Sequence, residues 1–429
     1  MERDNMQDLI AWKNKANRKP LIIRGARQVG KTWLIKEFGR TQYKKMVYVN
    51  FENAAELANL FVPDLDTKRI IQMLQIYSEI QIIPEDTLIV FDEIQSVERG
   101  LTSLKYFCED APEYHIIAAG SLLGMGLHQH VSFPVGEVNF MDIRPLSFNE
   151  FVRAVGKGML ADSLKKGEWN VISGFHDKLI QYLRSYLYIG GMPEVLQTWL
   201  DTDDMRQVRE VQQNIISSYQ SDFSKHAPYE QVPRILMVWN SIPSQLAKEN
   251  KKFVYGAVRN GSRAKDFEVS VLWLLDSGLL LKSNRVSKPD MPLIAYQDNN
   301  AFKLFTNDVG LLGAMSNLDA KTLLVGNDIF TEFKGALTEQ FVMQELVSAG
   351  TEYIGYWTND RSTSEVDFVI QNQGVISPIE VKSSVNVKAK SFKMFCEKYH
   401  PANAYRSSLL PYSEEEWMTN IPLYAVGSL

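Results

Sequence analysis

The chain has 429 residues, too many for one hydrophobic core, so two to four domains are expected. Apolar residues make up 45% and charged residues 23%, which is typical of a soluble globular protein, and the net charge of −5 does not favour a chain coated with nucleic acid. No stretch reaches the roughly 18–20 apolar residues that span a bilayer, and the polar N-terminus has no signal-peptide core. Cys108 and Cys396 are too far apart in sequence for a zinc motif or a disulfide framework. We therefore expect a cytoplasmic protein with no membrane partner.

The first 150 residues alternate short apolar runs with helix-like stretches, which predicts a parallel sheet with crossover helices. The runs lie at residues 21–23, 46–49, 88–91, 115–119 and 138–143. A mostly helical pattern follows, and apolar runs return after about residue 279. We predict an α/β chain in four parts: an α/β core at 1–150, a helical lid at 151–230, a third domain at 231–318 and a fourth at 319–429.

A phosphate-binding motif follows the first apolar run. The sequence GARQVGKT fits G-x-x-x-x-G-K-[ST], with an apolar strand before it and a helical pattern after it. Backbone N–H groups of such a loop surround the phosphates at the N-terminus of a helix, and its lysine neutralises the β- and γ-phosphate oxygens. We predict that ATP binds to Gly25, Ala26, Arg27, Gln28, Val29, Gly30, Lys31 and Thr32, and that the Thr32 hydroxyl is a Mg²⁺ ligand.

Two later strands are expected to end beside this loop. The run at 88–91 ends in Asp92 and Glu93; we assign Asp92 to the Mg²⁺ shell and Glu93 to polarising the attacking water. The run at 115–119 ends in Gly120-Ser121, and Ser121 fits a polar residue that senses the γ-phosphate, with an ordinary Gly-Ser turn as the alternative. Asn50 and Glu52, which end the strand at 46–49, are further candidates to face the nucleotide.

The segments GARQVGKT, YVNFE, LIVFDEIQ, AAGS, RPLSFNEF and YIGGMPEV, in this order, resemble one family along essentially the whole chain. It comprises bacterial and archaeal AAA+-like P-loop ATPases with a C-terminal domain of unknown function that has a nuclease-like core. The resemblance implies a sheet in which the strand before Asp92 lies between the P-loop strand and its neighbour, and a helical lid around residues 190–193. Arg144 either reaches phosphate or is an exposed loop arginine.

The third part suggests a winged helix, which the resemblance also implies. Residues 263–275 have helical spacing, with Phe267, Val271 and Leu274 on one face, and strands are expected at 279–282 and 302–306. Such a module either places a helix in the DNA major groove or serves domain packing. The acidic residues Asp266 and Glu268 on this helix leave both alternatives open.

The fourth part resembles PD-(D/E)xK nucleases and resolvases. Two strands, 366–370 and 375–381, are joined through residues 371–374 as a hairpin, which predicts that Asp367 lies beside Glu380. Glu380 and Lys382, two apart, share a face of the strand. By this resemblance Asp367, Glu380 and Glu339 would hold Mg²⁺, and Lys382 would activate water. Glu-x-Lys also occurs at Glu249–Lys251 and Glu332–Lys334, so the tripeptide alone carries little information.

Two functions remain open from the sequence. One is an ATP-driven machine that acts on nucleic acid, with DNA as a candidate partner, which the set Asp367, Glu380 and Lys382 favours. The other is a signal-transduction ATPase switch that binds a protein partner and keeps a vestigial nuclease site. A net charge of −3 over residues 333–429 (8 basic, 11 acidic) favours the second. Self-association is a further expectation for an AAA+-like protein, although no arginine finger is identifiable.

Overall fold

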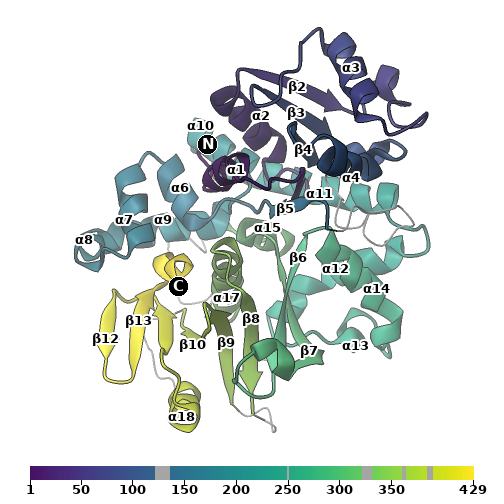
Figure 1. The fold of residues 1–429 in the computed structure, drawn as a ribbon. Helices are drawn as coiled ribbons and strands as arrows, with labels where there is room; N and C mark the ends of the chain where they lie inside the picture. The colour runs from purple at the N-terminus through teal and green to yellow at the C-terminus, as the bar shows by residue number, and fades with distance from the viewer. Residues whose placement is uncertain (121–135, 249–250, 321–330, 360–363, 384–389) are drawn as a thin grey trace. The chain divides into compact units, whose positions relative to one another are not determined.

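The computed structural model describes residues 1–120, 136–248, 251–320, 331–359, 364–383 and 390–429. The chain forms two compact units, one of Met1–Arg144 with Asp276–Gly278 and the other of Pro145–Leu275 with Leu279–Leu429. In Figure 1 the helices and strands are labelled, and the colour runs from purple at the N-terminus to yellow at the C-terminus. Within the described ranges, no helix is long and apolar enough to cross a membrane.

Five parallel strands form the sheet of the first unit, in the order β2-β3-β4-β1-β5. Their bounds confirm the five predicted runs: β1 Leu21–Arg24, β2 Lys45–Asn50, β3 Thr87–Asp92, β4 His115–Ala119 and β5 Asn139–Asp142. The strand that ends in Asp92, β3, was expected beside the P-loop strand β1. This prediction is wrong, because β4 lies between β3 and β1. Ala119 of β4 pairs with Asp92 on one side and with Ile23 on the other.

Helices pack on the sheet of the first unit, and the two later helices share one apolar core with it. The helices are α1 Asn5–Lys13, α2 Lys31–Gln42, α3 Thr67–Ser78 and α4 Gly100–Asp110. Strands β3 and β4 are buried along their whole length, as expected for parallel strands inside a sheet. Aromatic rings continue the core from Phe61 through Phe91 to Phe107, with ring centroids 5.8 and 6.3 Å apart. The parallel pairing of β4 with β1 and β3 places the carboxyl ends of these strands side by side.

The second unit begins with helices and continues into a mixed sheet. Its helices are α6 Phe148–Ala154, α7 Gly158–Lys166, α8 Trp169–Ile172, α9 His176–Ile189, α10 Pro193–Thr202, α11 Met205–His226, α12 Val232–Leu246, α13 Tyr255–Val258, α14 Ala264–Asp276, α15 Val309–Met315, α17 Thr331–Ser348 and α18 Lys390–Tyr399. Its strands are β6 Leu280–Val286, β7 Gln297–Thr306, β8 Tyr353–Thr358, β9 Glu365–Asn372, β10 Val375–Val381, β11 Tyr405–Ser408, β12 Ser413–Glu415 and β13 Met418–Pro422. The expected helix at 263–275 and the strands around it are confirmed.

One eight-stranded sheet joins the parts expected to be separate domains. Its order is β12-β13-β11-β10-β9-β8-β6-β7. Strands β6 and β7 form the expected antiparallel ribbon, but β6 also pairs in parallel with β8. The ribbon is therefore one edge of the C-terminal sheet, and this sheet crosses the boundary expected at residue 318. The four-part division of the chain stays a prediction.

The glycine pair after α9 is explained by a buried carboxylate. Gly190 has a φ of +78°, and a Cβ there would lie 2.2 Å from Asp308 Oδ1. Asp308 is fully buried and accepts hydrogen bonds from the N–H groups of Gly191 (2.6 Å) and Leu311 (3.0 Å). Asp308 thus caps α15 and fastens the turn between α9 and α10, so Gly190-Gly191 has a structural role within the second unit.

Candidate functional site

The P-loop connects β1 to α2 through two left-handed residues. Gln28 has a φ of +66° and Gly30, the residue before α2, has a φ of +94°. This backbone turns successive N–H groups toward one concave side at the positive end of a helix, which is an anion-binding arrangement. Lys31 Nζ donates to the carbonyl oxygens of Gly25 (2.7 Å) and Ala26 (2.8 Å), so the ammonium lies inside the loop.

The buried position of Lys31 changes its proton affinity. The side chain is only 8% exposed, and burial lowers the pKa of the Lys31 ammonium to about 8, although Glu93 and Asp92 act in the opposite direction. A buried ammonium gains most from an anionic neighbour because the low-polarity surroundings strengthen the attraction. The loop therefore places a weakly solvated cation where phosphate oxygens would bind.

Asp92, Thr32 and Tyr48 meet at the end of β3. The Thr32 hydroxyl lies 3.4 Å from Asp92 Oδ2, and the role of these two groups as Mg²⁺ ligands stays a prediction. Tyr48 donates its hydroxyl to the same carboxylate oxygen, and the Lys36 ammonium lies 4.5 Å from the centre of the Tyr48 ring. Burial and the adjacent Asp92 raise the pKa of Tyr48, which keeps the phenol protonated as a donor.

Sequence reasoning missed Tyr48, although a signal was present. Asn50, which pairs with Asp92 in the sheet, was a candidate to face the nucleotide, and Tyr48 is two residues earlier in β2. Residues two apart in a strand point to the same side, so the same argument applied to Tyr48. Asn50 itself accepts a hydrogen bond from the N–H of Glu52 (2.9 Å) and so stabilises the turn after β2.

Glu93 follows Asp92 in a left-handed conformation with a φ of +51°. A non-glycine residue in this region is uncommon and concentrates at functional turns. The half-buried Glu93 accepts a hydrogen bond from Gln95 Nε2 at 2.6 Å and is close enough to Lys31 to influence its pKa. Because the backbone turns at Glu93, this side chain does not continue the strand pattern of Asp92, which is consistent with different roles for the two acids.

Two further predicted positions concern the edge of this site. Ser121 lies outside the described residues; the strand before it, β4, ends between Asp92 and Ile23 in the sheet register. Arg144 is half-buried rather than an exposed loop arginine, and burial lowers the pKa of its guanidinium. Arg3, which was not predicted, is 5% exposed and donates to the carbonyl oxygens of Val29 (2.9 Å) and Arg144 (2.6 Å). Arg3 therefore braces the P-loop from the N-terminal segment.

The C-terminal hairpin places its acids as predicted. Phe368 of β9 pairs with Ile379 of β10 in an antiparallel ladder. One residue further along each strand, Asp367 therefore lies opposite Glu380. Asp367 Oδ2 accepts a hydrogen bond from the N–H of Val381 at 2.8 Å. Lys382 Nζ lies 2.6 Å from Glu380 Oε1, which confirms that these two side chains share a face.

Glu339 is held by lysines that sequence reasoning did not find. Its Oε1 lies 2.6 Å from Lys251 Nζ, and its Oε2 lies 3.3 Å from Lys303 Nζ. Burial would raise the pKa of Glu339, but Lys303 and Lys251 together lower it, so the carboxylate stays charged. Lys303 also pairs with Glu365 at 2.5 Å. The metal-ligand role of Glu339, Asp367 and Glu380 stays a prediction.

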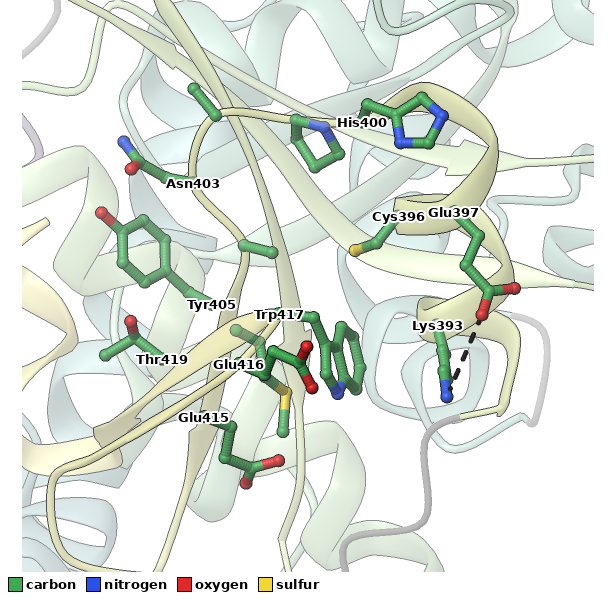
Figure 2. A pocket seen from close by; sticks show the side chains of 14 residues that line it. Lys393, Cys396, Glu397, His400, Asn403, Tyr405, Glu415, Glu416, Trp417 and Thr419 are labelled. Carbon is green, nitrogen blue, oxygen red and sulfur yellow. Dashed lines mark ion pairs between the residues drawn. The ribbon is translucent and has the colours of Figure 1, made fainter.

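A separate cavity of about 850 Å³ lies between α18 and strands β11 to β13 (Figure 2). Its lining includes Trp417, Tyr405 and His400 together with the ion pair Lys393–Glu397, whose charged atoms are 3.9 Å apart. None of the residues predicted to be catalytic lines this cavity. The wall residue Cys396 is buried, and burial raises the pKa of its thiol to about 11, which disfavours the reactive thiolate.

Comparison with known protein families finds matches to three segments of the chain. Residues 17–152 match the family described as AAA domain, residues 180–322 match Domain of unknown function (DUF8612), and residues 334–424 match Domain of unknown function (DUF4143). No curated protein sequence matches the chain.

Among solved structures, the chain is similar to a Walker-type ATPase of Pyrococcus abyssi, with 13% identity, a TM-score of 0.45, and 73% of this chain and 95% of that one covered. It is also similar to the Aeropyrum pernix ORC1 protein in complex with DNA, with 10% identity, a TM-score of 0.28, and 73% and 90% covered. Residues 17–152 thus match the AAA domain family and have the parallel sheet and P-loop of the P-loop ATPase fold.

Proposed function

We propose that the protein is a Mg²⁺-dependent ATPase whose site lies at the carboxyl ends of β1, β3 and β4. One observation carries the proposal: Thr32, an exposed residue directly after Lys31 in α2, has its Oγ1 3.4 Å from the carboxylate of the buried Asp92. A hydroxyl and a strand-end carboxylate are the oxygen groups with which P-loop ATPases hold Mg²⁺ beside the phosphates. The residues present therefore fit the metal.

In this proposal the chain's own groups divide the work of hydrolysis. Lys31 and the loop N–H groups stabilise negative charge on the terminal phosphate oxygens. Glu93 orients a water molecule and accepts its proton as the water attacks. Ser121, which lies outside the described residues, is assigned by its sequence position alone to sensing the terminal phosphate. The bound Mg²⁺ supplies further neutralisation of the phosphate charge.

A pair of lysine variants tests the binding site. Lys31→Ala removes the ammonium inside the loop, whereas Lys45→Ala removes an exposed lysine at the start of β2 in the same unit. We expect the first variant to lose nucleotide binding and the second to keep it, measured with a fluorescent ADP analogue. Equal affinity in both variants would refute the assignment of the P-loop.

For the second unit we propose that nucleotide state controls binding to a partner, and DNA is the partner that the nuclease-like hairpin favours. A specific observation supports the second candidate, a switch without cleavage: each glutamate of the predicted metal set has a lysine within 3.3 Å. The two candidates differ in one measurable respect, which is whether nucleic acid is cut.

Incubation with linear, single-stranded and branched DNA separates these candidates. The full chain is tested with Mg²⁺ or Mn²⁺, with and without ATP, beside a Glu380→Ala variant. Cleavage that disappears in Glu380→Ala would establish the nuclease. Binding without cleavage would favour a protein that binds DNA but does not cut it. The absence of both binding and cleavage would favour a protein partner.

A further inference from the structure

The carboxylates around the C-terminal hairpin are matched by lysines from distant parts of the chain. Four acids contribute: Glu339 from α17, Glu365 and Asp367 from β9, and Glu380 from β10. Three lysines face them: Lys251 from the segment before α13, Lys303 from β7, and Lys382 directly after β10. We call these seven residues the carboxylate–lysine cluster.

Lys303 occupies the interior of this cluster. Its side chain is 0% exposed, and its Nζ lies 3.3 Å from Glu339 Oε2 and 2.5 Å from Glu365 Oε1. The ring centre of Tyr356 is 4.9 Å from the same nitrogen. Lys303 therefore contacts two carboxylates of the cluster from a fully buried position, which is the arrangement expected for an ammonium group.

The lysines leave little of Glu339 for a metal ion. Both carboxylate oxygens are engaged, one by Lys251 and the other by Lys303. A divalent cation that bound Glu339 would have to displace at least one ammonium or lie beside it in a poorly hydrated interior, where repulsion between cations is strong. Among the described residues, no group of three or more histidine, cysteine, aspartate or glutamate side chains is arranged to hold a metal.

One oxygen in the cluster has no hydrogen-bond partner. Glu380 is 6% exposed, and its Oε2 is buried without a donor, while its Oε1 pairs with Lys382. Glu380 and the facing Asp367 are therefore the part of the cluster best suited to accept a cation, but they supply only two carboxylates. Mg²⁺ bound by so few protein ligands usually relies on substrate phosphates as well.

We propose that the Lys303 ammonium, which pairs with Glu339 of the predicted ligand set, takes the place of a divalent cation, so that this cluster is largely neutralised from within the chain and does not load Mg²⁺ or Mn²⁺. This inference supports the non-cleaving candidate for the second unit. It does not depend on the ATPase, because the cluster is built entirely from residues of the second unit.

Mn²⁺ binding to the full chain tests the inference, with nucleotide omitted so that an inactive P-loop does not affect the result. Free Mn²⁺ is measured by electron paramagnetic resonance in the wild type and in Glu380→Gln. We expect the same number of bound Mn²⁺ ions and the same affinity in both proteins. A wild-type site that disappears in Glu380→Gln would overturn the proposal.

A second experiment removes the Lys303 ammonium and asks whether a Mn²⁺ site appears. Lys303→Met should gain one Mn²⁺ site at least tenfold tighter than any wild-type site, and the double variant Lys303→Met/Glu380→Gln should lose it. Lys282→Met is the matched control, since Lys282 is a half-buried lysine on the adjacent strand β6 that is not in the cluster. A folded Lys303→Met that gains no site would contradict the assigned position of Lys303. If Lys303→Met does not fold, the comparison of wild type with Glu380→Gln decides.

Discussion

The P-loop site and the carboxylate–lysine cluster hold charged groups in different ways. The P-loop relies on backbone: left-handed turns at Gln28 and Gly30 shape a concave row of N–H groups, and one buried lysine completes it. The cluster relies on side chains that compensate one another across α17, β7, β9 and β10. The first arrangement leaves charge to be satisfied by a ligand, whereas the second satisfies most of its charge internally. We therefore expect the P-loop site to bind an anionic ligand. We expect the carboxylate–lysine cluster to need no such ligand, because its lysines already compensate most of its carboxylates.

The largest expected effect concerns the stability of the cluster. Lys303→Met leaves Glu339 and Glu365 without their shared partner, and breaking a buried pair in this way costs about 3–5 kcal/mol. Urea denaturation followed by tryptophan fluorescence measures the loss. Lys393→Met is the control, because its pair with Glu397 is more than half exposed on both sides and should contribute little. Equal stability of the two variants would show that the cluster is not held by Lys303.

The backbone geometry of the P-loop is tested by adding one carbon. Gly25 has a φ of +144°, and a Cβ at this position would lie 2.2 Å from the carbonyl oxygen of Ile143. Gly25→Ala should weaken nucleotide binding by roughly a hundredfold, or about 2.7 kcal/mol, because the loop must change its conformation. Gly174→Ala, where a Cβ meets nothing within 4 Å, should leave affinity unchanged. Retention of wild-type affinity by Gly25→Ala would contradict the backbone account of this site.

The pH dependence of nucleotide binding tests the buried ammonium. Because burial lowers the pKa of Lys31 to about 8, the free protein carries the charge below that pH and loses it as the pH rises. Phosphate binds to the charged form, so affinity should be constant below about pH 7 and fall by up to tenfold per pH unit above about pH 8. Titrations with a fluorescent ADP analogue between pH 6 and 9.5 measure this. Lys31→Arg keeps its charge throughout, so a similar fall in that variant would assign the effect to another group.

The smallest expected effect concerns Tyr48. Tyr48→Phe removes the hydroxyl that hydrogen-bonds to Asp92, and we expect the Mg²⁺ concentration for half-maximal ATPase activity to rise about three- to tenfold, in keeping with a net contribution of about 1 kcal/mol from one hydrogen bond. Nucleotide affinity without Mg²⁺ should not change, which distinguishes positioning of Asp92 from a general loss of structure. Tyr43→Phe is the matched control, since its hydroxyl contacts His115. An equal rise in the required Mg²⁺ concentration in both variants would contradict the assignment of Tyr48 to the Mg²⁺ site.

The first unit could be predicted almost completely because its information is local. Gly25–Thr32 is contiguous, and the strands at 21–23 and 88–91 are apolar runs of the length expected for buried parallel strands. The position of β4 between β1 and β3 could not be obtained from such runs, because strand order depends on how crossover helices pack and not on the strands themselves. Tyr48 was accessible to the argument used for Asn50.

The second unit was predicted less completely because its contacts are distant in sequence. The hairpin of β9 and β10 was found from a turn and two apolar runs, and with it the register of Asp367 and Glu380. Lys303 belongs to a strand assigned to a different domain, and no motif connects it to Glu339 across 36 positions. A buried lysine can be identified only when the acids that compensate its charge are brought together by the fold. The same limit explains why β6 and β7 appeared to be a separate wing.

The measurement that tests the central claim most directly is ATP turnover by Glu93→Gln, with nucleotide affinity determined on the same protein. The variant keeps the size of the side chain but removes the carboxylate that would accept the proton of the attacking water. We predict Mg²⁺-dependent ATP hydrolysis by the wild type, wild-type affinity for ATP in Glu93→Gln, and a fall in turnover of at least about a hundredfold. Unchanged turnover in Glu93→Gln, or a wild type that binds ATP without hydrolysing it, would contradict the account.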